Sequence, residues 1–463
     1  MEIKPDRNSM WSLYGGAISE WMSMGVIGRL VMPILTTGFA IRPEVVSWAM
    51  TLPRMLDAVL DPFVGHLSDR TQSRWGRRRP FAFIGALLCA AMAMAIWWIS
   101  PKWSEAVQFG YLLTVGTVFW VGFALFSISI YAMNYELVDG CSYQHRVRFF
   151  AIRSLFCQVA VLAAGGWAYW LVLRPMFGGE IAGIRWVSII LASLILLGGW
   201  APALLFKERF AARAKEATSH SLWQGMREAW RIQPMRQLII IRLLLGFGFA
   251  IFNGLYLYVN IYHACGGDKM LATKIAGLTE IANVALNVLQ VPLVAPLARR
   301  MGRRSLLLVG IGAHLGLAAT GFLFFTPDMP YLQIASTLFW APAGFVFGTV
   351  CASAIPDICD LDELQNGTRR EGLFGAAIVF LNKMEVALCT LIPGYVLVFS
   401  GFVGDAVKQS EHTLFWLRVC SYTPYVLVGI IAILIALRYP LTEQVMAKVR
   451  ADLAQRRNGG TAT

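Results

Sequence analysis

The run PFAFIGALLCAAMAMAIWWIS, at residues 80–100, decides the fold class, because it contains no charged side chain. A helix of about 20 apolar residues spans the roughly 30 Å hydrocarbon core of a bilayer. Eleven similar runs lie at 12–40, 43–68, 107–135, 149–173, 186–206, 237–263, 271–297, 305–326, 331–355, 371–402 and 413–437. The sequence therefore predicts an all-α membrane protein with twelve transmembrane helices.

The composition excludes a water-soluble protein. Of the 463 residues, 57% are hydrophobic and only 14% are charged, whereas an average soluble domain carries about 25% charged residues. The mean hydropathy is +0.59. A single soluble core also stops growing at roughly 250–300 residues.

The net charge of +13 is distributed unevenly between the two sides of the predicted membrane. Lys and Arg gather at the N-terminus, near 69–79, 139–148, 207–236, 299–304 and 357–370, and after 437. The opposite side has only Arg42, Lys102, Arg174, Arg185, Lys269, Lys274 and Lys408. This asymmetry predicts that both termini are cytoplasmic. The basic residues serve topology, so we expect no nucleic-acid partner.

The sequence contains no pattern typical of a metal, disulfide or nucleotide site. Its eight cysteines are scattered without a C-x-x-C pair, which supports neither a zinc site nor a disulfide framework. No glycine-rich phosphate loop with Lys-Ser/Thr occurs. We therefore expect no cofactor, no metal and no enzymatic activity.

A long polar connection, Lys207–Arg236, divides the chain into similar halves. We predict six-helix bundles at 1–206 and 237–438, a cytoplasmic central loop at 207–236, and a cytoplasmic tail at 439–463. A short basic loop follows the second helix of each half, at 77–79 and 299–304. This repeat resembles the signature of the major facilitator superfamily, whose two halves rock around a site near the membrane midplane.

Three charged residues lie inside the second predicted helix, in LPRMLDAVLDP at residues 52–62. Asp57 and Asp61 are four residues apart, and Arg54 precedes Asp57 by three, so all three share one helical face. A charge at the bilayer centre costs at least about 2.5–3.5 kcal/mol. The pattern favours a cation site, because one arginine leaves one acid uncompensated. The alternative is a structural pair between Arg54 and one aspartate.

Two longer motifs carry a family resemblance. The first is Asp57-Ala58-x-x-Asp61-Pro62-x-x-Gly65, followed by Asp69-Arg70-x-x-Ser73-Arg74-Trp75-Gly76-Arg77-x-Arg79-Pro80-Phe81. The second runs from Asp357-x-x-Asp360-x-Asp362-Glu363-Leu364 through Arg369-Arg370-Glu371-Gly372 to Lys383. Together they resemble the signature of the glycoside–pentoside–hexuronide:cation symporters, typified by the melibiose permease. The resemblance spans both halves of the chain.

The resemblance implies a cation site and its coupling residues. The family's paired cation-binding acids fall on Asp57 and Asp61, and its helix-two arginine falls on Arg54. Its cavity lysine of helix eleven falls on Lys383, within an otherwise mostly apolar helix. We expect Lys383 to pair with the aspartates and to link the cation and substrate sites, since a lysine there needs a partner. Snorkelling to the interface is the alternative.

The resemblance also implies substrate residues. The family's helix-one acid falls on Glu20, and a substrate-side arginine of helix five falls on Arg153. Arg153 has an alternative role, because it could instead pair with Glu136. Aromatic rings can stack on the apolar face of a sugar, and the candidates are Trp21, Trp120, Tyr131 and Tyr256. Aromatic residues in spans also act as core or interfacial residues.

The sequence departs from the family at the proposed site. Ser127 takes the place of a second sugar-facing acid, and Leu60 and Ala124 replace polar neighbours that help to coordinate sodium. A hard cation requires several oxygen ligands, whereas two close carboxylates bind a proton readily. We therefore favour protons as the coupling ion and keep sodium as the alternative.

The basic loop after the second helix has a predicted role of its own. Asp69, Arg70, Arg74 and Arg77 look like a cytoplasmic gate that holds adjacent helices, and they also determine topology.

The sequence thus predicts a multi-pass transporter of a bacterial inner membrane, acting as a monomer among lipids. It would carry a glycoside or related polar solute by cation-coupled symport. A lysolipid or other amphipathic solute is the alternative substrate. A membrane sensor or a membrane-bound enzyme is the alternative of another class, but the chain lacks a soluble sensor domain and a nucleophile–base set.

Overall fold

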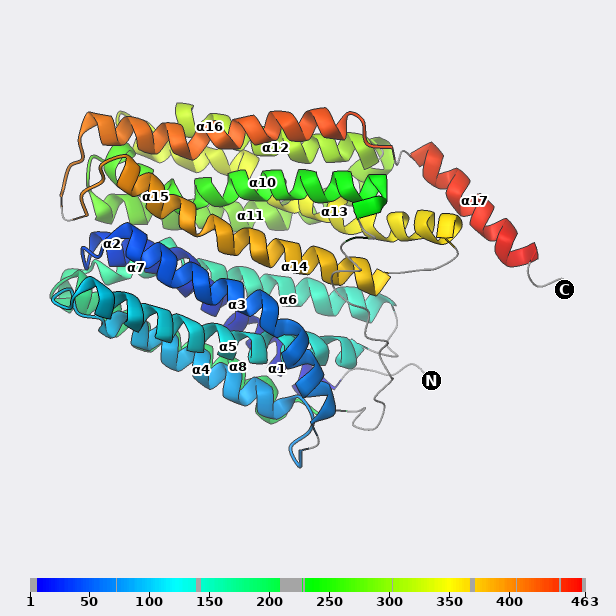
Figure 1. The fold of residues 1–463 in the computed structure, drawn as a ribbon, viewed down its shortest axis with the longest axis horizontal. Coiled ribbons are helices and arrows are strands. Elements are labelled where there is room, and N and C mark those ends of the chain that lie inside the picture. The colour runs from blue at the N-terminus through cyan, green and yellow to red at the C-terminus, as the bar shows by residue number, and fades with distance from the viewer. Residues whose placement is uncertain are drawn as a thin grey trace. The chain divides into compact units, whose positions relative to one another are not determined.

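The computed structural model describes residues 6–71, 73–138, 143–208, 227, 230–301, 303–366, 371–404, 406–440 and 443–459. Within these ranges every regular element is a helix, and Figure 1 shows their order along the chain. Nine helical runs of this described part are long and apolar enough to cross a membrane. The predicted all-α class is confirmed, whereas the number of twelve spans stays a prediction.

Three further helices are long enough to cross a membrane. They are α3 (Pro43–Arg70), α11 (Lys269–Met301) and α13 (Thr337–Asn366), with 28, 33 and 30 residues. Helix α3 carries Arg54, Asp57 and Asp61 inside its length. Such a composition is typical of a helix that lines a polar site rather than one that faces lipid.

Internal contacts divide the chain into two compact units. The first unit contains Met1–Glu216, Cys265–Glu280 and Thr390–Thr413, and the second contains Ala217–Ala264, Ile281–Cys389 and Leu414–Thr463. The predicted bundles at 1–206 and 237–438 and the predicted tail at 439–463 stay predictions. The predicted central loop at 207–236 lies mostly outside the described residues.

The first unit is built from helices of the N-terminal half. They are α1 (Arg7–Gly25), η1 (Val26–Val31), α2 (Met32–Thr37), α3, α4 (Arg79–Ala95), η2 (Ile96–Trp98), α5 (Glu105–Val138), α6 (Tyr143–Ala163), α7 (Gly166–Val172), η3 (Pro175–Phe177) and α8 (Glu180–Leu205). The start of α11 and helix α15 (Leu391–Phe399) also belong to this unit. Helix α5 packs against α3 and α4, and α1 packs against α6 and α8 (Figure 1).

Glycines set the closest helix crossings of the first unit. A Cβ on Gly122 of α5 would lie 2.6 Å from Leu88 Cβ of α4, and a Cβ on Gly85 would lie 2.6 Å from the Gly122 carbonyl oxygen. Gly15 of α1 and Gly198 of α8 meet in the same way. Apolar side chains gain little by leaving lipid, so close backbone approach through small residues holds membrane helices together.

Two predicted apolar runs are each divided into two helices. The run at 149–173 breaks between α6 and α7, where a Cβ on Gly165 would collide with the Glu280 carboxylate. The run at 371–402 breaks at Thr390, between α14 (Glu371–Cys389) and α15. Apolar composition marks where a span lies, but it does not reveal such breaks.

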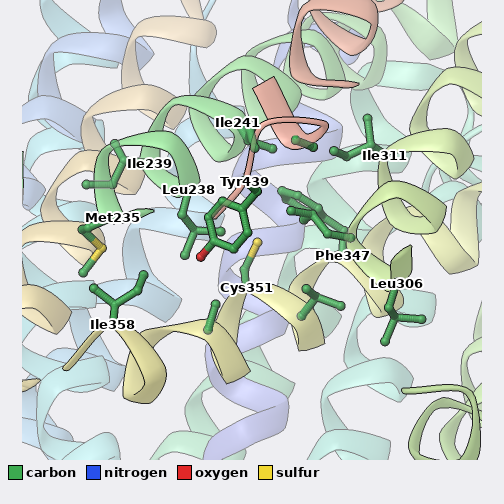
Figure 2. Close-up of a cluster of buried hydrophobic side chains, with 14 of the residues drawn as sticks. Met235, Leu238, Ile239, Ile241, Leu306, Ile311, Phe347, Cys351, Ile358 and Tyr439 are labelled. Carbon is green, nitrogen blue, oxygen red and sulfur yellow. The ribbon is translucent and has the colours of Figure 1, made fainter. Parts of the chain in front are cut away.

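The second unit has an extensive apolar core. Its elements are α10 (Gln233–Tyr258), η4 (Val259–Ala264), the rest of α11, α12 (Arg303–Leu323), η5 (Pro330–Ser336), α13, α14, α16 (Glu411–Ala436) and α17 (Glu443–Gly459). Figure 2 shows side chains of α10, α12 and α13 pointing toward one another around Cys351 and Tyr439. Met446, Val449 and Leu453 of α17 join this core, so the amphipathic C-terminal helix packs on its own unit.

The α4–α5 crossing provides a test of the fold. We expect Gly122→Ala to lower the unfolding temperature of the purified protein, because the new methyl group would force the helices apart. Overpacking of this kind costs roughly 1–3 kcal/mol. The matched control is Gly110→Ala on the same helix, where nothing lies within 4 Å of the added Cβ. Equal stability of the two variants would contradict the close crossing.

Candidate functional site

The two aspartates of α3 lie in the interior of the first unit. Asp57 is fully buried and Asp61 is half-buried. Arg54 Nη1 approaches Asp57 Oδ2 to 3.7 Å, which is an ion pair at longer than hydrogen-bond distance. The Arg54 charge also interacts electrostatically with Asp61. The predicted group of Arg54, Asp57 and Asp61 is therefore brought together, while its role stays a prediction.

Arg54 is held by contacts to two other helices. Its Cζ lies 3.8 Å from the ring centroid of Trp120 on α5, which is a cation–π contact. Its Nη1 lies 3.6 Å from the Met24 Sδ of α1. Trp120 is only 4% exposed, so its ring packs on Arg54 and is not open to stack on a solute.

A second polar cluster joins α1, α5 and α6. Arg153 Nη2 donates to Glu20 Oε2 over 2.5 Å, and the Glu20 side chain is only 5% exposed. Glu20 is also hydrogen-bonded to Tyr131, and Arg153 Cζ lies 5.5 Å from the Tyr131 ring. Tyr131 is 45% exposed, so the cluster reaches the surface of the unit at this ring. Three predicted substrate residues thus form one constellation.

The structure contradicts the alternative in which Arg153 pairs with Glu136. Arg153 pairs with Glu20, whereas Glu136 pairs with Arg78 through a contact of 3.3 Å. The pairing leaves Arg153 beside Tyr131, where both groups can offer hydrogen bonds to a polar solute.

Helix α1 connects the two clusters. Glu20 and Met24 are four residues apart, so they share a face of α1 and differ by about 6 Å along its axis. Met24 contacts Arg54, and Glu20 contacts Arg153. A displacement of Arg54 that moves Met24 would therefore also move Glu20, because both residues belong to α1.

Some predicted residues do not join these clusters. Trp21 is 42% exposed and contributes no ring or polar contact within the described part of the chain. Lys383 is half-buried on α14, which belongs to the second unit, and its predicted pairing with the aspartates stays a prediction. Ala124 and Ser127 of α5 are both buried.

The basic loop after α3 is anchored by a carboxylate that sequence reasoning missed. Glu208 accepts hydrogen bonds from the backbone N–H groups of Arg77, Arg78 and Arg79 at 2.7, 2.8 and 3.1 Å. These groups form the N-terminus of α4, where an anion is favoured. Gly76 has a φ of +109° and leaves room for this carboxylate.

The four predicted gate residues have different surroundings. Arg74 is exposed and Arg77 is half-buried beside the Glu208 anchor. Asp69 and Arg70 end α3, and their side chains lie outside the described part of the structure. The gate function of this loop stays a prediction. The sequence gives one indication of this role for Glu208, which is its position directly after an apolar run.

A further, partly buried ion pair was also missed. Arg29 of the π-helical segment η1 pairs with Glu280 of α11, and Glu280 Oε2 accepts the Gly166 N–H of α7 over 3.2 Å. Near the start of α11, Lys269 Nζ donates to Glu180 Oε2 over 2.7 Å, and Glu180 accepts from the Tyr169 hydroxyl over 2.6 Å. These contacts fix the first part of α11 onto the N-terminal helices.

Arg242, Asn382 and Glu385 are polar residues within the helices of the second unit. Arg242 Nε of α10 donates to Asn382 Oδ1 of α14 over 2.7 Å. The half-buried Glu385 lies one turn further along α14, directly against Gly246. Among the described residues, no group of three or more His, Cys, Asp or Glu is arranged to hold a metal ion.

The Arg29–Glu280 pair can be tested by a double-mutant cycle. We expect Glu280→Gln to lower the unfolding temperature, because it leaves the Arg29 charge in the span without its carboxylate. Breaking a fully buried pair costs about 3–5 kcal/mol, and we expect a smaller loss here because the Arg29 side chain is 33% exposed. Apolar replacement of both partners is often neutral. Adding Arg29→Met to Glu280→Gln should therefore recover stability. Additive losses in the two single variants would contradict the ion pair.

Comparison with known proteins gives consistent results. A family model described as MFS/sugar transport protein matches residues 19–443. The isoprimeverose transporter of Lactiplantibacillus pentosus is 24% identical, over 94% of this chain and 88% of its own. The glucuronide carrier protein homolog of Escherichia coli K12 is 23% identical, over 88% and 87%. The solved structure of the nucleoside transporter NupG, 16% identical, has a TM-score of 0.63 over 95% of this chain and 99% of that chain, which shows a shared fold.

Proposed function

We propose that this chain, which belongs to the MFS/sugar transport protein family, is a cation-coupled symporter that carries a glycoside or related polar solute by alternating access. The family is one of transporters rather than enzymes, so the chain is a membrane transporter of sugar-like solutes. Cation coupling and the individual solute are the proposed parts.

The burial of Asp57 carries the proposal. Its side chain is fully buried in a membrane helix, with Arg54 at 3.7 Å and Asp61 one turn away. An ionised carboxylate in a low-dielectric site is costly unless a positive charge or a proton accompanies it, and two carboxylates one turn apart favour the binding of a cation. Leu60 and Ala124 add no oxygen ligands, which supports a proton over sodium as the coupling ion.

The solute site is proposed at Glu20, Arg153 and Tyr131. A carboxylate, a guanidinium and a phenol can accept from and donate to sugar hydroxyl groups, and the half-exposed Tyr131 ring gives an apolar face. Two relatives are described as carrying isoprimeverose and glucuronide, which supports a glycoside over a lysolipid. In this state Glu20 and Arg153 satisfy each other, so a solute would bind by inserting between them.

Coupling is proposed to run through helix α1. Arg54 touches Met24, and Glu20 lies one turn away on the same helix. A cation that binds the α3 aspartates changes the charge that Arg54 faces, and the change is transmitted to the solute pair. Lys383 is proposed to extend this coupling to the second unit.

The membrane arrangement is part of the proposal. The nine apolar helical runs together with α3, α11 and α13 supply twelve spans. The excess of Lys and Arg near both termini and in the connections on the same side supports cytoplasmic termini in a bacterial inner membrane. The protein is proposed to work as a monomer.

The cation site can be tested in proteoliposomes. We expect Asp57→Asn and Asp61→Asn each to abolish uphill uptake driven by a proton or sodium gradient, because the acid that binds the cation is lost. Exchange of labelled for unlabelled solute at equal concentrations should persist, since it needs no net cation movement. The matched control is Asp268→Asn in the loop before α11, where the amide can still accept the Leu271 N–H.

Gradient-driven accumulation by the Asp57→Asn, Asp61→Asn double variant would show that the energy source lies elsewhere. Uptake that follows a sodium gradient and ignores a proton gradient would reverse the assignment of the ion while leaving the site intact.

The solute site can be tested through the concentration dependence of exchange. We expect Glu20→Gln and Arg153→Gln to raise the half-saturating glycoside concentration roughly 10- to 100-fold, because a hydrogen bond to a charged group contributes about 1.5–3 kcal/mol. Arg185→Gln is the control, since Arg185 Nε donates to the Trp97 carbonyl oxygen away from this cluster. Unchanged saturation by glycosides in both variants, or saturation by lysolipids alone, would contradict the assignment.

A further inference from the structure

Arg54 lies between the Asp57 carboxylate and the face of the Trp120 ring. Arg54 Nη1 stays 3.7 Å from Asp57 Oδ2, whereas Arg54 Cζ lies 3.8 Å from the ring centroid of Trp120. A relaxed guanidinium–carboxylate pair has N···O distances of about 2.7–2.9 Å. The cation therefore rests on the indole face and only partly on the carboxylate.

The backbone at this point explains how the indole reaches Arg54. Pro53 lacks an N–H, so the Ala49 carbonyl oxygen of α3 loses its usual helical donor. A Cβ on Gly116 of α5 would lie 3.2 Å from Pro53 Cγ and 3.5 Å from that carbonyl oxygen. The glycine lets α5 approach α3 closely here. Trp120 follows one helical turn later and covers Arg54, the residue after Pro53.

We propose that Trp120 is a positioning residue that holds the Arg54 guanidinium off Asp57, so that the coupling cation can compete for this carboxylate. The proposal rests on the proposed function, because it assumes that Asp57 binds the cation. Arg54 then acts as an internal counter-cation. The guanidinium lies beside Asp57 when no coupling cation is bound, and it stays on the Trp120 ring when a cation binds Asp57.

The Asp57 carboxylate and the Trp120 ring compete for the Arg54 guanidinium. A bidentate Arg54–Asp57 pair in a dry site would satisfy both charges and exclude another cation. A guanidinium without any partner would be too costly in the span. The indole face supplies attraction without occupying a carboxylate oxygen. The Met24 sulfur, 3.6 Å from Nη1, adds a weak second contact on the same side.

A purely structural role for Trp120 is the competing explanation. Its ring makes edge contacts with the rings of Phe119 and Phe123, with centroids 5.3 Å away in each case. If packing alone mattered, removal of any buried ring of this cluster would have the same effect. Phe119 is fully buried and adjacent in sequence, and no cation–π contact joins it to Arg54 within the described residues.

The test measures apparent cation affinity in proteoliposomes, from the dependence of glycoside uptake on pH and, at fixed pH, on added sodium chloride. We expect Trp120→Leu to weaken apparent cation affinity about tenfold, equivalent to about 1.4 kcal/mol, because Arg54 then closes onto Asp57. Trp120→Phe keeps an aromatic face and should restore most of the affinity. Arg54→Gln should tighten cation binding, and Trp120→Leu should have no further effect in that background.

The control is Phe119→Leu, which removes a buried ring of the same cluster and should leave the cation dependence unchanged. A folded Trp120→Leu protein with wild-type cation affinity would overturn the proposal. An equal loss in Phe119→Leu would overturn it too, in favour of packing. If instead Asp57→Asn and Asp61→Asn keep the wild-type cation dependence, the proposed function itself fails, whatever Trp120 does.

Discussion

The constraint on which the first unit depends is the cost of keeping ionised groups away from water. Asp57 is fully buried and Arg54 is 6% exposed, and neither is stable as an isolated charge in a membrane span. Their mutual approach of 3.7 Å balances the two charges without locking them together. The contacts of Arg54 with Trp120 and Met24 then bring α5 and α1 to the same point on α3. The buried Arg54 guanidinium thus links α3 to α5 and α1.

The other charges of the first unit follow the same rule. Glu20 pairs with Arg153, Glu136 pairs with Arg78, and Glu280 pairs with Arg29. The Glu20–Arg153 and Glu280–Arg29 pairs join helices that are distant in sequence, so each of these two pairs also fixes a helix contact. The pairs differ in what surrounds them. The Glu20–Arg153 pair lies beside the half-exposed Tyr131 ring, whereas Glu280 is also bound by a backbone N–H at a helix break, which makes it a structural joint.

The sequence predicted features that depend on composition or on local spacing. Apolar length revealed the helices, and the spacing of Arg54, Asp57 and Asp61 placed them on one face. The pairing of charges could not be predicted, because it depends on which helices cross and at what depth. For Arg153 the sequence suggested a substrate-binding role or a pairing with Glu136, and its pairing with Glu20 follows only from the packing of α1 on α6. Trp120 looked like a candidate for sugar stacking, but its face is covered by Arg54.

A transporter that couples two solutes needs the binding of one to alter the site of the other. In the first unit, the contacts of Arg54 with Asp57 and Met24 could link the two binding sites. In the proposed mechanism, a cation at Asp57 changes the attraction between this carboxylate and Arg54, which also contacts Met24. Because Met24 and Glu20 share one face of α1, a small rotation of α1 changes the distance between Glu20 and Arg153. The cation can therefore weaken or strengthen the internal ion pair with which a polar solute competes.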